Sequence, residues 1–138
     1  EGAEWRYQVS KTKTNHIVPL AEQAIAILRD LQPLTSSSAF VFPSARTMSR
    51  PMSENTINAA LRRLGITKDK QTAHGFRAMA RTMLEEVKGY RPEWIERQLA
   101  HEVRDPNGRA YNRTAFIRQR RAMMQDWADY LDQLRASR

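Results

Sequence analysis

The spacing of hydrophobic residues changes after about the first twenty positions of the chain. Large and polar residues alternate along WRYQV (5–9), β-branched residues lead to a proline in HIVPL (16–20), and the polar stretch SKTKTN separates the two. Such runs on either side of a polar, turn-prone stretch are typical of two paired strands. The pattern therefore predicts a β-hairpin over residues 5–19, with Lys11 and Lys13 exposed in its loop.

Beyond residue 20 the apolar residues recur every three or four positions, which is the spacing of one face of an α-helix. The predicted helices cover residues 20–31, 54–64, 72–87, 89–102 and 114–135. The residues expected in the core are Leu20, Ala24, Ile27, Leu28, Leu31, Ile57, Ala60, Leu61, Leu64, Phe76, Ala80, Met83, Leu84, Val87, Trp94, Ile95, Leu99, Ala100, Phe116, Met123, Trp127, Tyr130 and Leu134. Pro33 is expected to stop the first helix, Ser53 to cap the second and Gly65 to end it. Pro92 suits the first turn of the fourth.

The stretch between the first two predicted helices, residues 33–53, is predicted to be a loop with a short apolar insert, AFVF. It is too short for a linker between domains, and no internal repeat or low-complexity tract interrupts the chain. A chain of 138 residues, 41% of them hydrophobic, can bury one core. We therefore predict a single domain over residues 1–138, mainly α with a small N-terminal antiparallel β-hairpin, in the α+β class.

The composition narrows the class of protein. There is no cysteine, so there is neither a disulfide framework nor a thiolate metal site. No apolar run approaches the roughly 20 residues that span a bilayer, and the first residues lack a signal-peptide pattern. Lys and Arg number 23 against 15 Asp and Glu, a net charge of +8. This balance indicates a polyanionic partner, most often nucleic acid, although a solvated basic surface gives the same charge. The run RQRRAMMQDW (118–127) is most simply such a surface, and it could also touch a DNA backbone.

The sequence HGFR (74–77) places a histidine and an arginine three positions apart. On a helix this spacing puts both side chains on one face. The guanidinium of arginine can bind two phosphate oxygens at once, and histidine adds a further donor. Taken alone, the pair is more simply a first-turn histidine beside a solvated arginine.

The sequence LAHEVRDPNGRAYNR (99–113) holds a second group of candidates. His101 ends a predicted helix, where a cation interacts favourably with the helix dipole. A turn sequence follows, and then Tyr111, with Arg104, Arg109 and Arg113 nearby. A phenol needs positive neighbours to become a nucleophile, although most buried tyrosines are packing residues. The chain has no pattern for a zinc or calcium site, a glycine-rich phosphate loop or a G-x-S-x-G nucleophile elbow.

These segments follow a distinctive order: a hairpin lysine, H-x-x-R, L-A-H and A-Y-N-R. The ordered set resembles the catalytic domain of the tyrosine recombinases, the phage integrase family. The segments TAHGFRAMARTML, IERQLAHEVRDPNGRAYNR and RRAMMQDWADYLD resemble in particular the integrases of genomic islands and satellite prophages. The resemblance runs from the hairpin to about residue 132. It implies DNA recombination through a 3′-phosphotyrosyl intermediate, with no metal or nucleotide cofactor.

The resemblance also implies a role for each matched residue. Tyr111 is the expected nucleophile and Arg77 the second of two arginines that grip the scissile phosphate. His74 is the paired donor and acid–base group, His101 contacts a non-bridging oxygen, and Lys11 is the general acid for the leaving oxygen. Further residues expected to contact DNA are Lys13, Arg104, Arg109 and Arg113.

The partners implied are duplex DNA at attachment sites and other copies of the protein in a tetramer, with accessory DNA-bending proteins as further candidates. A cytoplasmic, nucleoid-associated protein without a membrane partner is expected. The family's first arginine lies in a G-x-R-x-x-E segment ahead of the hairpin, which this chain lacks, as it lacks the upstream DNA-binding domains. We therefore expect the C-terminal portion of an integrase catalytic domain, poorly active alone. Two alternatives stay open: a non-catalytic basic DNA-binding module, and a type IB topoisomerase-like enzyme that relaxes DNA.

Overall fold

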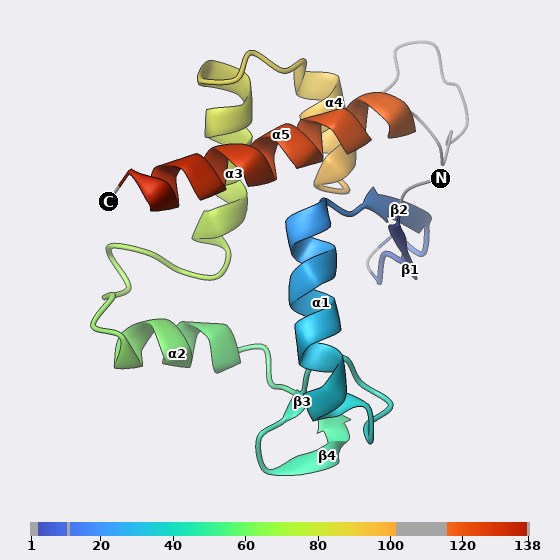
Figure 1. Cartoon of the computed structure of the whole chain (residues 1–138), viewed down its shortest axis with the longest axis vertical. Coiled ribbons are helices and arrows are strands. Elements are labelled where there is room, and N and C mark those ends of the chain that lie inside the picture. The colour runs from blue at the N-terminus through green and yellow to red at the C-terminus, as the bar shows by residue number, and fades with distance from the viewer. Residues whose placement is uncertain (1–2, 11, 102–115, 138) are drawn as a thin grey trace. The chain divides into compact units, whose positions relative to one another are not determined.

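A computed structural model describes residues 3–10, 12–101 and 116–137 of the chain (Figure 1). The chain forms two compact units. One unit combines residues 1–25 with residues 81–138, and we call it the terminal unit; the other, the central unit, consists of residues 26–80. The expectation of a single domain stays a prediction.

The terminal unit begins with the predicted hairpin, which is confirmed. Strands β1 (Glu4–Gln8) and β2 (Asn15–Pro19) pair antiparallel. The loop between them is closed by two backbone hydrogen bonds of 2.8 Å, from Val9 N to Thr14 O and from Lys13 N to Val9 O. Lys13 has a left-handed backbone, with φ 55°, and its side chain is exposed.

Three helical segments complete the terminal unit: the later part of α3 (Gly75–Glu86), α4 (Pro92–Gln98) and α5 (Ile117–Ala136). Helix α5 packs against α4 and against β2, and Figure 1 shows it passing across α4. Pro92 lies in the first turn of α4, as predicted. The buried apolar residues of this unit are Pro19, Ala21, Leu84, Ile95, Met123 and Trp127. In the described part of the chain, no helix is long and apolar enough to cross a membrane.

Helix α5 also caps the start of α1 (Glu22–Thr35). The side-chain oxygen of Gln125 accepts a hydrogen bond of 3.0 Å from the backbone N–H of Glu22. The amide group of Gln125 donates to Gln23 and to Asp129, both at 2.9 Å, and Gln23 donates to Asp129 at 2.8 Å and to Asp132 at 3.1 Å. Because the first N–H groups of a helix have no partner within it, this ladder stabilises the beginning of α1.

A charged cluster fastens the connection between α3 and α4 to α5. Lys88 Nζ lies 2.8 Å from Asp126 Oδ1, and the Tyr90 hydroxyl donates to Asp126 Oδ2 at 2.9 Å. The hydrogen bond from Lys88 lowers the pKa of Asp126 below its usual value and outweighs the effect of burial, which would raise it. The hydrogen bond from Tyr90 lowers this pKa further. Burial, reinforced by Asp126, raises the pKa of Tyr90.

The central unit contains a hairpin that the sequence did not predict. Strands β3 (Pro43–Ser44) and β4 (Thr47–Pro51) pair antiparallel within the stretch expected to be a loop, so that expectation was wrong. Both strands contain a proline, which cannot donate to a strand ladder and counts against a strand in sequence analysis. Helix α2 (Thr56–Arg63) follows and buries Leu61.

Two expected helix boundaries were also wrong. Pro33 does not stop α1, which continues to Thr35. Proline removes one N–H donor and its ring crowds the preceding turn, but Pro33 lies close to the end of α1, where the Thr35 hydroxyl donates to Leu31 O at 3.3 Å. Ser53 does not cap α2: the N-cap is Asn55, without a side-chain cap bond, and the Ser53 hydroxyl pairs with the Thr56 hydroxyl at 3.0 Å.

Helical spacing marked several residues as core that the structure leaves exposed. These are Ile27, Ala60, Ile57, Leu64, Phe76, Val87, Phe116 and Leu134. The opposite error concerns Arg120, which was placed on a solvated basic face and is only 1% exposed. A 3.6-residue period identifies a helix face, but burial depends on whether another element covers that face.

Helices α2 and α4 end in the same type of turn. After α2, Gly65 N bonds to Arg62 O and the next N–H to Leu61 O, both at 3.0 Å; after α4, Ala100 N bonds to Arg97 O at 3.2 Å, and the next N–H again reaches back five residues. The residue in the turn is left-handed in both cases, with φ 77° at Gly65 and 55° at Ala100. Glycine adopts this conformation freely, whereas alanine is strained in it.

We therefore expect opposite effects from exchanging the two residue types. Gly65→Ala should lower the free energy of unfolding by about 1 kcal/mol, and Ala100→Gly should raise it by up to about 1 kcal/mol. Urea denaturation followed by circular dichroism measures both. A loss of stability in Ala100→Gly, as for an ordinary helical alanine, would contradict the strained turn.

Asp126→Asn should lower the free energy of unfolding by about 1 kcal/mol at pH 7, a value kept small because the aspartate is 37% exposed. A carboxylate whose pKa is lowered by folding stabilises the protein above its unfolded pKa of about 4 and loses this effect as the pH falls through the folded pKa. The difference between wild type and variant should therefore shrink below about pH 4. Thermal unfolding from pH 3 to pH 7 checks this, with the exposed Asp30→Asn as the matched control. A difference that is constant with pH would refute the electrostatic explanation.

Candidate active site

The candidate pair His74 and Arg77 lies at the beginning of α3. His74 directly precedes the helix, and its carbonyl accepts a hydrogen bond of 3.0 Å from the backbone N–H of Arg77. Both residues are exposed. The N-terminus of a helix carries partial positive charge and unpaired N–H groups, which favour an anion. The pair is therefore well placed for a phosphate that approaches from solvent.

The segment before this pair is fastened to α2. Arg62 donates to the carbonyl of Gln71 through both terminal nitrogens, at 3.1 and 3.0 Å. The side-chain oxygen of Asn58 accepts from Ala73 N at 2.9 Å, and the Thr72 hydroxyl accepts from Gly75 N at 3.0 Å. These contacts fix the backbone that carries His74. Sequence reasoning missed Asn58 and Arg62, because both appear as ordinary polar positions of a helix.

His101 is held by a charged chain at the end of α4. Its Nδ1 pairs with Glu96, whose other oxygen accepts a hydrogen bond of 2.6 Å from Arg81 Nε. Arg81 also bonds Glu85 at 3.0 Å. Burial alone would raise the pKa of Glu96, but the hydrogen bonds from His101 and Arg81 outweigh it and hold that pKa below its usual value. The ionised carboxylate therefore orients the imidazole ring.

A small hollow joins the hairpin to the end of α4. Its volume is about 20 Å³, and it is lined by Val9, Thr14, His16, Arg97, Ala100 and His101. The ring of His16 lies 3.4 Å from the carbonyl of Gln98. The structure thus brings His16 and Arg97 next to His101, and sequence reasoning assigned neither of them to the site. The loop that carries Lys13 belongs to the same hairpin.

The remaining candidates lie outside the described residues. They are Lys11, Arg104, Arg109, Tyr111 and Arg113. Of the described candidates, His74 and Arg77 belong to the central unit, and His101 and Lys13 to the terminal unit. Within the ranges that the structure describes, no three His, Cys, Asp or Glu residues are grouped so that they could hold a metal ion.

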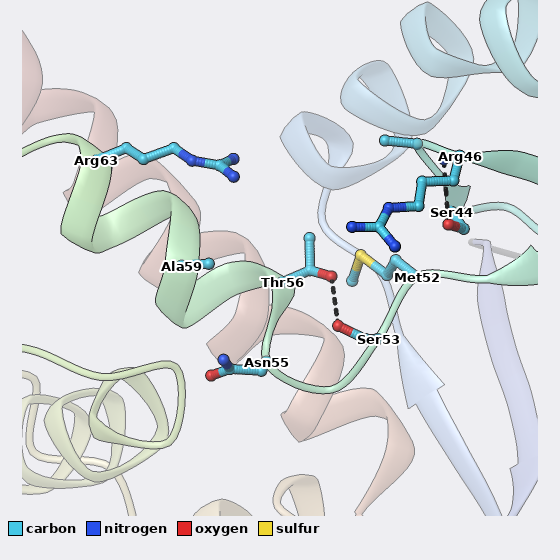
Figure 2. A pocket seen from close by; sticks show the side chains of 9 residues that line it. Ser44, Arg46, Met52, Ser53, Asn55, Thr56, Ala59 and Arg63 are labelled. Atoms are coloured by element: carbon cyan, nitrogen blue, oxygen red, sulfur yellow. Dashed lines mark hydrogen bonds between the residues drawn. The ribbon is translucent and has the colours of Figure 1, made fainter.

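The central unit has a second basic feature, a hollow of about 470 Å³ between the β3–β4 hairpin and α2. Figure 2 shows Arg46 and Arg63 extending from opposite walls toward the space between them. Hydroxyl groups of Ser44, Ser53 and Thr56 also line it. Two guanidinium groups and several hydroxyls are the groups that bind phosphate oxygens. Sequence analysis did not single out these two arginines, because their common hollow depends on the unpredicted hairpin.

Comparison with known proteins shows extensive similarity to integrases. The family model described as the phage integrase family matches residues 1–117. The chain is 45% identical over 129 residues to the prophage integrase IntZ of Escherichia coli (strain K12), which covers 94% of this chain and 31% of that protein. It is 42% identical over 134 residues to the integrase of Enterobacteria phage P4, covering 96% of this chain and 30% of that protein.

A more distant relative, the integrase of Shigella phage Sf6, is 34% identical over 130 residues, which cover 91% of this chain and 32% of that protein. The chain thus spans about a third of the length of these relatives. No solved structure matches the chain. The family match covers most of the chain and agrees with the resemblance of its H-x-x-R, L-A-H and A-Y-N-R segments, so the chain belongs to the phage integrase family.

Proposed function

We propose that this chain is the nucleophile-bearing part of an enzyme that recombines duplex DNA at specific sites. The observation that carries the proposal is the exposed His74–Arg77 pair at the N-terminus of α3 in a chain of the phage integrase family. Strand exchange joins two duplexes, and the family resemblance implies a tetramer of the intact protein on DNA.

In the proposed reaction the Tyr111 hydroxyl oxygen attacks a DNA phosphorus atom. A bond forms between this oxygen and phosphorus, the bond from phosphorus to the 5′ oxygen breaks, and a 3′-phosphotyrosyl link remains. His74 is proposed to accept the tyrosine proton, and Lys11 to give a proton to the leaving 5′ oxygen. The released 5′-hydroxyl of a partner strand then attacks the link and regenerates Tyr111. No bond energy is lost, so the cycle needs no nucleotide cofactor.

Positive charge around the phosphate supplies the stabilisation that this step needs. Negative charge accumulates on the phosphate oxygens in the transition state, and donors fixed in advance stabilise it most. Arg77 is proposed to bind two of these oxygens, because its planar group presents paired donors. His101, oriented by Glu96, is proposed to donate to another. Loss of one such donor typically costs a factor of about 10²–10³ in rate.

The hollow of Arg46 and Arg63 extends the proposed DNA interface. A net charge of +8 favours backbone contacts, which position a protein on duplex DNA without reading its sequence. Arg46 and Arg63 face one hollow from two walls, so each can contact a phosphate of a DNA backbone that follows this surface.

Covalent trapping tests the proposed chemistry. The chain is mixed with nicked duplexes that carry a candidate attachment site, in which the cleaved fragment diffuses away, and protein–DNA adducts are resolved on a denaturing gel. We expect an adduct with wild type, and none with Tyr111→Phe, which lacks the attacking oxygen. Arg77→Ala should reduce adduct formation by about 10²–10³-fold.

Each alternative predicts a different result. Salt-sensitive DNA binding without any adduct, both for this chain and for the full-length parent protein, would favour a non-catalytic binding module. An adduct accompanied by plasmid relaxation and no strand exchange would favour a topoisomerase-like enzyme. An adduct that persists in Tyr111→Phe would show that another residue is the nucleophile.

DNA affinity measured against salt concentration tests the arginine hollow. Each backbone contact contributes about one unit to the slope of log affinity against log salt. Arg46→Ala and Arg63→Ala should each lower this slope by about one and weaken binding equally across sequences. Arg29→Ala, which removes an exposed arginine of α1, controls for the loss of net charge. Equal slopes for all three variants would argue against a phosphate site in the hollow.

A further inference from the structure

Arg120 is a charged residue inside the core of the terminal unit. It lies in the first turns of α5 and is only 1% exposed. Its Nε donates a hydrogen bond of 2.9 Å to the side-chain oxygen of Gln98, at the end of α4, and its Nη2 donates to the carbonyl of Ile17 in β2. One guanidinium group therefore connects three elements.

The burial of this group is unfavourable by itself. Removal from water, with a smaller effect from Arg97, lowers the pKa of Arg120 to about 10, so the group stays charged at neutral pH. Within the described part of the chain both acceptors of Arg120 are neutral oxygens, and no carboxylate pairs with it. A buried charge of this kind often costs more than a well-packed apolar side chain of similar size. The buried Arg120 side chain therefore contributes mainly by fixing the geometry of the elements that it connects.

Each acceptor of Arg120 is next to a histidine of the candidate site. Ile17 follows His16 in β2, and Gln98 lies at the end of α4, within the turn that leads to His101. The carbonyl of Gln98 also lies 3.4 Å from the His16 ring. Both histidines line the small hollow between the hairpin and α4.

We propose that Arg120 is a positioning residue that fixes β2 against the end of α4 and thereby sets the placement of His101 relative to the hairpin. For catalysis, this inference rests on the proposed function, in which His101 donates to the phosphate and the hairpin supplies the lysine. An apolar side chain can fill the same volume, but it cannot donate to both acceptors. Lysine has no planar fork that would reach them together.

The first test measures, in the absence of DNA, whether Arg120 fixes the positions of β2 and the two histidines. Arg120→Met, Arg120→Lys and the control Arg118→Met, which alters an exposed arginine of the same helix, are compared by thermal unfolding, histidine ring NMR and amide hydrogen exchange. We expect the signals of His16 and His101 to shift, and the amides of β2 to exchange at least tenfold faster, in both Arg120 variants and not in the control. Unchanged ring signals and exchange rates in a folded Arg120→Met would overturn the inference.

If Arg120→Met does not fold, a second variant tests the same positioning role. Gln98→Leu removes one acceptor and leaves the bond to Ile17 in place. Shifted ring signals in Gln98→Leu support the positioning role, and signals equal to those of wild type overturn it.

The second test measures the rate of covalent adduct formation. At saturating nicked duplex, Arg120→Met should form the covalent adduct at least tenfold more slowly than wild type, with an unchanged Kd for DNA. Equal rates would overturn the catalytic part of the inference. If wild type itself forms no adduct, the proposed function fails, and the NMR and exchange results still decide whether Arg120 fixes the two histidines.

Discussion

The terminal unit depends on the inner face of α5. Arg120, Met123 and Trp127 follow one another at helical spacing along this face, and all three are buried. Through this face α5 packs on α4 and β2. Elsewhere on the helix, Asp126 binds the connection between α3 and α4, and Gln125 caps α1. Without α5, these elements would share few other contacts in their unit. Neither the hairpin nor α4, a helix of seven residues, is long enough to be stable alone.

Turns and helix ends, more than helix interiors, place the chemical groups. His74 and Arg77 sit where α3 begins, and His101 sits just after the left-handed Ala100 that ends α4. Each is braced by neighbours that do not themselves touch the proposed substrate: Asn58 fixes the backbone before His74, and Glu96 pairs with the imidazole of His101. Rigid bracing of this type is what electrostatic stabilisation of a transition state requires, because donors that must reorganise lose their advantage.

Local patterns in the sequence were enough for the N-terminal hairpin, for the end of α2 at Gly65 and for the common location of His74 and Arg77. Each of these depends on residues within a few positions of one another. The burial of Arg120 does not, because its acceptors Gln98 and Ile17 are 22 and 103 positions away. An arginine in an amphipathic helix is naturally assigned to the polar face, and only the tertiary fold reverses that assignment. The β3–β4 hairpin escaped prediction for another reason: its strands are short and each has a proline at one end, so no alternating pattern marks them.

The cap that Gln125 provides for α1 has a consequence for the order in which the molecule can form. The two bonded residues are separated by 103 positions, so the first turn of α1 lacks this partner while the ribosome is still adding the intervening chain. Contacts of such long sequence separation form late and slow the folding of a domain. In a nascent chain the start of α1 therefore gains this cap only after the segment of α5 has left the ribosome. Synthesis from the N-terminus delays the completion of this unit, and any chaperone that assists it would act during that interval.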